Sequence, residues 1–128
     1  HMILINLRPQ KLNSWFLAES LEQAGIVTNR NAISVDGVSS KAIFYPSGLR
    51  LGTQALTARG MREREMKQIA KWIVEIIRHL GEREIPDDKN EREHILKQFK
   101  KEIYKDPLLN EIHDKVEKMC KRFPIDLK

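Results

Sequence analysis

The stretch SGLRLGT, residues 47–53, sets one arginine among leucines and glycines. Successive side chains of a β-strand point to opposite faces, so Leu49 and Leu51 fall on one face and Arg50 on the other. We expect the glycines on either side of this trio to leave the backbone uncovered and open to a ligand. The run therefore predicts a short strand that carries an arginine on its outer face.

Arg50 is the candidate binding residue of this strand. A guanidinium is a planar fork that matches both oxygens of a carboxylate, and the pairing is more directional than one made by lysine. The alternative is a solvated or salt-bridged surface arginine, which is the common role of an arginine on an edge strand. Taken alone, the strand leaves both interpretations open.

The residues before this strand predict a second strand and a helix. Apolar residues alternate along residues 3–7, and Pro9 ends that strand because it lacks a backbone donor. Asn13 or Ser14 can cap the following helix, and Gly25 lies where a left-handed C-terminal cap is expected. This order predicts a strand, a helix and then further short strands.

The middle of the chain is rich in β-branched residues and turn signals. Residues 26–28 and 31–35 are short β-branched runs, and the pair Asp36-Gly37 indicates a turn. With residues 49–53 these segments predict a small, mainly antiparallel sheet.

The C-terminal half changes to a helical period. Apolar residues recur at helical spacing from Met66 to Leu80, and Gly81 ends the run. Asp87 or Asp88 can cap a second helix, and the pair at residues 106–107, Asp-Pro, begins a third. Helices that follow a short sheet predict an α+β fold, a two-layer small domain with the sheet packed against helices.

Length and composition limit the classes of protein. The chain has 128 residues, enough for one domain. We interpret His1-Met2 as a cloning remnant and residues 3–128 as a single domain.

No apolar run approaches the roughly 20 residues that cross a bilayer, so we expect a cytoplasmic protein without a membrane partner. Cys120 is the only cysteine, and the histidines show no zinc-ligand spacing with it, so we expect no metal.

The charge is basic but mixed along the chain. The formal net charge is +5, yet residues 62–128 hold 17 Lys and Arg against 15 Asp and Glu. This pattern favours solvated helix faces, and we expect no nucleic-acid partner. A basic RNA-binding module remains the alternative; it would need a contiguous basic surface with exposed aromatic rings, in a chain with 6% aromatic residues.

Several blocks of the sequence occur in an order that resembles the C-terminal small domain of serine hydroxymethyltransferase, a pyridoxal-phosphate enzyme. The blocks are LINLRP at residues 4–9, AGIVTNRNAI at 24–33, SGLRLGT at 47–53, LTARGM at 56–61, EMKQIAKWI at 65–73 and CKRFPI at 120–125. The resemblance covers most of the chain and implies the same two-layer α+β fold.

The resemblance implies a role in the interconversion of serine and glycine, with transfer of a one-carbon unit to a reduced folate or pterin. It assigns Arg50 to the α-carboxylate of the substrate. Pyridoxal phosphate would be bound mainly by the missing upstream part, since no lysine here has the family's Thr-Thr-x-His-Lys setting and no glycine-rich phosphate loop is present. We therefore expect the isolated chain to be inactive and the full-length enzyme to be a homodimer.

Asn31 matches the family position that contacts the pterin ring of the one-carbon carrier. An amide can both donate to and accept from a heterocycle. The family usually continues with an Asp-Pro-x-Ser-Pro-Phe loop, whereas residues 36–46 read DGVSSKAIFYP. The resemblance therefore leaves two carriers open: tetrahydrofolate, and tetrahydromethanopterin, which archaeal relatives use. The alternative for Asn31 is a turn residue with a left-handed backbone. We expect Arg59 to be structural.

A stand-alone interaction module derived from the same domain is another alternative. A domain cut from a larger enzyme exposes an apolar patch of the order of several hundred Å², whereas a stand-alone module covers that surface with polar groups. The exposed surface of the fold distinguishes the two.

Overall fold

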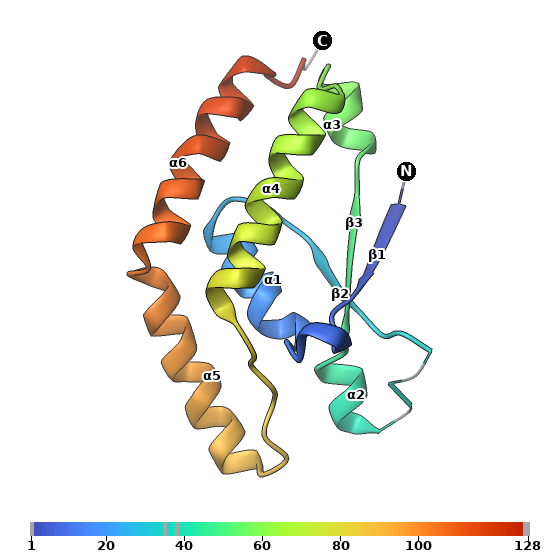
Figure 1. Cartoon of the computed structure of the whole chain (residues 1–128), viewed down its shortest axis with the longest axis vertical. Helices are drawn as coiled ribbons and strands as arrows, with labels where there is room; N and C mark the ends of the chain where they lie inside the picture. Colours follow the sequence, from blue (N-terminus) through green and yellow to red (C-terminus); the bar gives the residue numbers. More distant parts are fainter. Residues whose placement is uncertain (1, 35, 38, 127–128) are drawn as a thin grey trace.

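A small antiparallel sheet forms one side of the molecule (Figure 1). The computed structural model describes residues 2–34, 36–37 and 39–126. The strands β1 (Met2–Asn6), β2 (Asn29–Asn31) and β3 (Gly48–Gly52) lie in the order β1-β3-β2, and both pairings are antiparallel. The strand that carries Arg50 is therefore the central one.

The longer helices occupy the other side of the molecule, whereas the short helices that flank β3 in sequence lie at its two ends. The elements are η1 (Arg8–Gln10), α1 (Ser14–Gln23), α2 (Ser40–Phe44), α3 (Gln54–Ala58), α4 (Glu63–Leu80), α5 (Lys89–Tyr104) and α6 (Pro107–Arg122). The α1 helix packs against the sheet, and α4, α5 and α6 pack against α1. The sequence-based α+β fold, with a short antiparallel sheet packed against helices, is confirmed.

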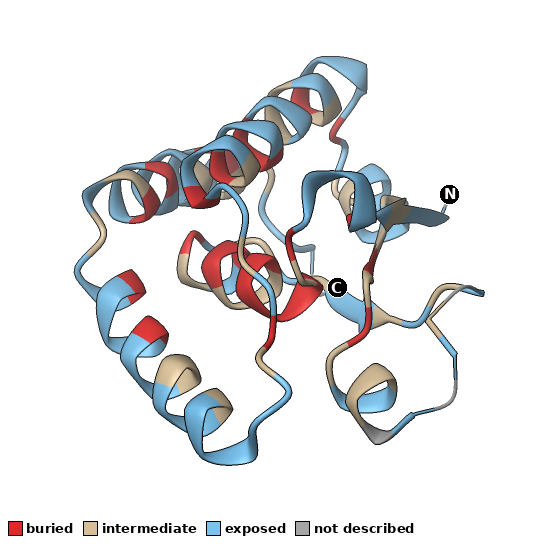
Figure 2. Cartoon of the chain, turned by 60° about the horizontal axis from the view of Figure 1, so that its bottom comes forward, coloured by how far each residue is buried: buried red, intermediate tan, exposed pale blue. Residues whose placement is uncertain are grey.

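The hydrophobic core is centred on α1. Figure 2 shows the buried residues gathered on α1 and on the sides of the neighbouring helices that face it. Phe16 contacts Phe99 of α5 edge to face, with ring centroids 4.9 Å apart, and Leu49 reaches the same core from β3. Burying such a side chain completely stabilises the fold by about 1.5–3 kcal/mol relative to leaving it exposed. The core thus fixes β3, and with it Arg50, to the helical layer.

The helix ends follow the capping signals in the sequence. Trp15 N donates to the side chain of Asn13 at 2.9 Å, and Asp88 and Asp106 accept backbone N–H groups at the starts of α5 and α6. Gly25 adopts a left-handed φ of 84° directly after α1. These local signals were sufficient to place four helix ends.

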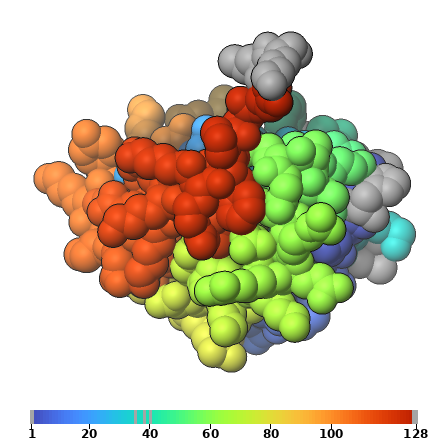
Figure 3. Space-filling view, turned by 90° about the horizontal axis from the view of Figure 1, so that it is seen from above, coloured from blue at the N-terminus to red at the C-terminus, as the bar shows by residue number. Residues whose placement is uncertain are grey.

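The ends of α3 and α6 meet at one end of the molecule. Figure 3 shows the last residues of α6 beside α3 and the start of α4. Arg59 joins them, because its Nε donates to Phe123 O at 2.7 Å and its Nη2 donates to Cys120 O at 3.1 Å. The expectation that Arg59 is structural is confirmed.

The middle of the chain differs from the prediction. Residues 26–28 form no strand, and β2 begins only at Asn29, where it can pair with β3. Of the run 31–35, only Asn31 lies in a strand, and Val35 is outside the described residues. Asp36 accepts a hydrogen bond from Ile33 N, which draws residue 33 out of the strand ladder. The α2 helix was not predicted at all.

Across the described part of the chain, no helix combines the length and the apolar character that a membrane crossing requires.

Candidate functional site

Arg50 lies at the centre of the sheet. Its Cα is paired with Leu4 of β1 on one side and with Asn29 of β2 on the other, and its side chain is half-buried. Leu49 is fully buried in the core, so Arg50 extends from the opposite face, as the alternation of the strand predicts. The core packing of Leu49 thereby sets the direction of the arginine.

Arg50 lines a pocket of about 500 Å³ beside the β2 edge of the sheet. The other lining residues are Ala18, Glu19, Glu22, Val27, Thr28, Asn29 and Arg30. Glu19 and Glu22 stand on the α1 wall, yet neither forms an ion pair with Arg50. Among the residues that the structure describes, none hydrogen-bonds to the Arg50 guanidinium, which leaves its five donors available.

Thr28 supplies a second unused polar group in this pocket. Its hydroxyl oxygen is buried and has no hydrogen-bond partner within the described ranges. A buried polar group without a partner costs free energy, so such groups are rare outside sites that receive a ligand or water. Sequence reasoning missed Thr28, because its burial depends on how α1 and β2 approach each other.

The glycine before the arginine is not an open surface for a ligand. Gly48 is buried, and a Cβ atom built there would lie 2.4 Å from Asn31 O and 2.9 Å from Ile33 Cγ2. The expectation that Gly48 leaves the backbone uncovered is wrong, because β2 and the side chain of Ile33 cover it. Gly52, at the other end of β3, is exposed as expected.

Asn31 lies on the same face of the sheet as Arg50. It is paired with Gly48, which places it diagonally from Arg50, a relation that separates residues by about 7–8 Å. Its side-chain Nδ2 donates to Ala32 O at 3.3 Å, and the side chain is half-buried. The alternative of a left-handed turn residue is wrong, because Asn31 belongs to β2 and Lys11 is the only non-glycine residue with positive φ in the described chain.

Asp36 holds together the segment between Asn31 and Arg50. Its Oδ2 accepts hydrogen bonds from Ile33 N and from Ser47 N, each at 3.0 Å, and its Oδ1 accepts one from the Ser47 hydroxyl. Partial burial raises the pKa of Asp36, but the hydrogen bonds from Ser47 and Ile33 outweigh it and hold the pKa below its ordinary value. The sequence indicated only a turn here, since the contact with Ser47 is not local.

The comparison with protein families agrees with this geometry. The family profile described as "Serine hydroxymethyltransferase" matches residues 1–73, which contain all three strands and both candidate residues. The chain belongs to the serine hydroxymethyltransferase family.

Three relatives named "Serine hydroxymethyltransferase" match 125 residues of the chain, 98% of its length. The proteins from Acidobacterium capsulatum and Wolbachia pipientis are each 34% identical, and the protein from Methanosarcina barkeri is 33% identical. The match spans 23% of the first relative and 24% of the other two. The chain thus corresponds to a small part of a serine hydroxymethyltransferase.

The family implies pyridoxal phosphate, but the described residues do not form a site for it. The cofactor of such an enzyme is attached to an enclosed lysine. Every described lysine except Lys41 is exposed, and Lys41 is half-buried in an ion pair with Asp87 at 2.5 Å. The hydrogen bond from Lys41 lowers the pKa of Asp87. No step of the reaction can therefore be assigned to a lysine of this serine hydroxymethyltransferase segment.

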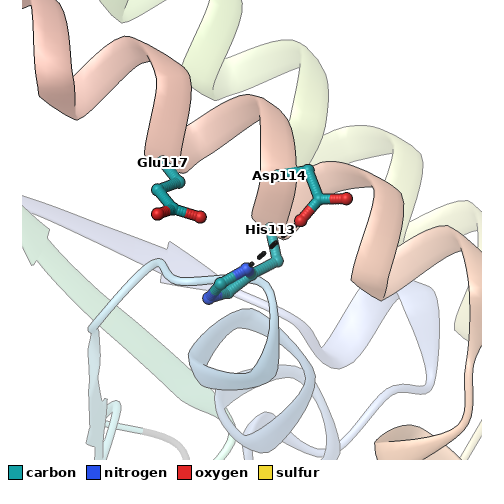
Figure 4. A group of neighbouring side chains, drawn as sticks. All are labelled: His113, Asp114 and Glu117. Atoms are coloured by element: carbon teal, nitrogen blue, oxygen red, sulfur yellow. Dashed lines mark ion pairs between the residues drawn. The ribbon is translucent and has the colours of Figure 1, made fainter.

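One group of potential metal ligands lies on α6 (Figure 4), and none of its members lines the pocket of Arg50. His113, Asp114 and Glu117 are all exposed, and His113 Nδ1 lies 3.8 Å from Asp114 Oδ1. Glu117 is also paired with Lys121 at 3.3 Å, and exposed acidic groups of this kind are common without a bound ion.

Proposed function

We propose that this chain is the substrate-binding small domain of a serine hydroxymethyltransferase. The complete enzyme interconverts serine and glycine and passes a one-carbon unit to a reduced pterin. One observation carries the proposal: an arginine on the central strand, half-buried, whose guanidinium has no partner among the described residues. The family membership makes an amino-acid carboxylate its ligand.

Arg50 binds the α-carboxylate of serine or glycine through paired hydrogen bonds. Hydrogen bonds to charged groups are worth about 1.5–3 kcal/mol each, so a two-bond contact is strong enough to orient a small substrate. The core packing of Leu49 and the strand pairing on both sides hold the Arg50 backbone in place. The arginine thus orients the amino acid, while the rest of the enzyme supplies the cofactor.

Asn31 contacts the pterin ring of the one-carbon carrier in this proposal. Its position on the same face as Arg50 supports a single site that receives both the amino acid and the carrier. The carrier is tetrahydrofolate or tetrahydromethanopterin. The segment between residues 36 and 46, which contains α2, departs from the family's usual loop and makes the modified pterin a candidate.

The remaining assignments concern the complete protein. Residues 3–128 belong to the small domain. Pyridoxal phosphate is bound mainly by the part of the enzyme outside this chain, and the enzyme is a cytoplasmic homodimer without a nucleic-acid or membrane partner. The isolated chain is inactive, which an assay of serine cleavage with added pyridoxal phosphate measures directly.

The exposed surface favours a domain that is covered in a larger protein over a stand-alone module. Met2, Ile3 and Leu4 of β1 are 59%, 49% and 51% exposed, next to the face that carries Arg50. An RNA-binding module is not favoured, because the large exposed aromatic residues of the described chain, Phe44 and Tyr104, lie on separate helices.

The test is Arg50→Ala in the complete enzyme. We expect loss of serine cleavage with retained cofactor absorbance, because the variant lacks the carboxylate contact but not the cofactor site. Arg30→Ala is the matched control, since Arg30 lines the same pocket from the opposite face of the sheet. Unchanged activity of Arg50→Ala, or equal losses in both variants, would contradict the proposal.

A further inference from the structure

A basic groove runs between α4 and α6 at the end of the molecule seen in Figure 3. It has a volume of about 520 Å³. Arg64, Lys67 and Lys71 line it from α4, Arg122 lines it from α6, and Met119 contributes an apolar wall. Because the two helices run antiparallel, the N-terminal half of α4 faces the C-terminal end of α6.

No cation of the basic groove forms an ion pair with a carboxylate of the described chain, although Arg64 and Arg122 interact electrostatically with Glu65. Other lysines on α6 are paired one turn away, Lys115 with Glu111 at 3.1 Å and Lys121 with Glu117 at 3.3 Å. In contrast, no described carboxylate lies within ion-pair distance of the groove cations. Their positive charge is therefore available to a ligand.

Two glutamates also line the groove and offset part of its charge. Glu65 is buried and committed to the helix cap, where its Oε2 accepts a hydrogen bond from Arg62 N at 2.9 Å. Glu63 is exposed. Four cations against two carboxylates leave the lining with a net positive charge.

The helix ends add to this charge. The N-terminus of α4 contributes partial positive charge, which favours an anion and is offset in part by Glu63 and Glu65 in the first turn of the helix. The C-terminus of α6 would disfavour one, but Arg59 already occupies the carbonyl oxygens of Cys120 and Phe123. The partial negative charge at the C-terminus of α6 is thus offset by Arg59, which is part of the fold.

We propose that the basic groove binds a phosphate chain, either an inorganic polyphosphate or the triphosphate of a nucleotide. Arginine matches phosphate oxygens with two parallel hydrogen bonds, and lysine acts on them as a point charge. A chain of linked phosphates suits cations spread along two facing helices better than a single carboxylate does. The site is separate from Arg50 and does not depend on the proposed enzyme function.

The experiment is a calorimetric titration of the purified chain with tripolyphosphate, and in parallel with ATP, at about 50 mM salt, where phosphate contacts are weakly screened. We expect saturable binding of tripolyphosphate that weakens as salt is added. Equal affinity for ATP assigns the site to the phosphate chain, and tighter binding of ATP assigns it to a nucleotide.

The decisive comparison is between two charge-matched variants. Lys67→Gln with Lys71→Gln should weaken tripolyphosphate binding by at least about tenfold, whereas Lys97→Gln with Lys101→Gln on α5 should change it by less than about twofold. Arg122→Gln tests the groove from the other helix if the first variant loses helical circular dichroism. Equal losses in the two lysine pairs, or no saturable binding of the unaltered chain, would overturn the proposal.

Discussion

Arg50 illustrates how one residue can be both fixed and available. Its backbone is held by strands on both sides, while its guanidinium forms no ion pair or hydrogen bond within the described chain. A solvated surface arginine without a ligand does not require a backbone that is fixed by strand pairing on both sides. We therefore expect carboxylate binding at Arg50 to depend on the planar geometry of the guanidinium as well as on its charge.

Arg50→Lys in the complete enzyme separates these two properties. A single ammonium cannot match both oxygens of a carboxylate, so we expect the KM for serine to rise at least about tenfold, equivalent to about 1.4 kcal/mol. Steady-state kinetics with serine as the varied substrate measure this effect. A KM equal to that of the unaltered enzyme would show that the charge alone is sufficient.

Asp36 makes the stability of the chain depend on pH. The pKa of Asp36 is lower in the folded protein than in the unfolded chain. Its ionised carboxylate therefore stabilises the fold at pH values above the pKa of the unfolded chain, and this stabilisation is lost as the pH falls through the pKa of the folded protein. We expect Asp36→Asn to lower the free energy of unfolding by about 1 kcal/mol at neutral pH, because the hydrogen bonds lose their charged acceptor. Urea unfolding at pH 7 and at pH 3 should show the difference between the two proteins shrinking in acid.

Asp114→Asn is the matched control for this experiment. Asp114 is exposed on α6 and is not a helix cap, so the substitution removes one carboxylate without breaking a backbone contact. A pH dependence in Asp114→Asn equal to that in Asp36→Asn would attribute the effect to net charge instead.

At the scale of elements, α6 depends on a single cap. Asp106 accepts hydrogen bonds from Leu108 N at 2.9 Å and Leu109 N at 3.4 Å, and it also pairs with His79 at the end of α4 at 2.6 Å. The same carboxylate thus begins one helix and joins it to another.

Asp106→Ala should lower the free energy of unfolding by about 1–2 kcal/mol, the usual cost of removing an N-terminal cap. Thermal melting followed by circular dichroism measures the loss. Glu111→Ala, within the same helix and exposed, should change stability by less than about 0.5 kcal/mol. Equal losses in both variants would indicate that the cap contributes nothing specific.

The elements that sequence could predict are those with local signals. Asn13, Asp88 and Asp106 each cap a helix a few residues away, so the long helices were placed correctly. The position of β2 was wrong because it is set by pairing with Arg50, which lies about 20 residues further along the chain. The short α2 and α3 helices lack the repeated apolar spacing that reveals a helix.

The candidate site also combines residues that local sequence motifs identify with residues whose roles depend on contacts distant in the sequence. Arg50 and Asn31 are recognisable because family motifs are local in sequence, whereas the roles of Asp36 and Thr28 depend on contacts formed only in the fold. Ser47, the hydrogen-bond partner of Asp36, is 11 residues away, and neither residue type predicts this contact.

At the scale of the whole molecule, the sheet has an exposed edge. β1 pairs on one side only among the described strands, and its Met2, Ile3 and Leu4 are about half exposed. An unpaired apolar edge is a template for association with another chain. We expect the isolated protein to self-associate at high concentration.

Leu4→Lys should reduce this association, because a charged side chain on an edge strand opposes pairing with a second copy. Sedimentation velocity over a range of concentrations measures it. Val27→Lys is the control, since Val27 is 82% exposed but lies outside β1. Association that persists in Leu4→Lys and disappears in Val27→Lys would place the contact elsewhere.

The carboxylate of Asp36 also bears on how this domain changes over evolution. It accepts hydrogen bonds from Ile33 and from Ser47, which lie just inside the two residues proposed to contact carrier and substrate. Residues 37–46, which lie between Asp36 and its partner Ser47, can therefore vary in length and in sequence while this contact keeps the spacing of Asn31 and Arg50 the same. Under the proposed roles of Asn31 and Arg50, we expect a change of carrier to require substitutions in residues 37–46 and none in β3.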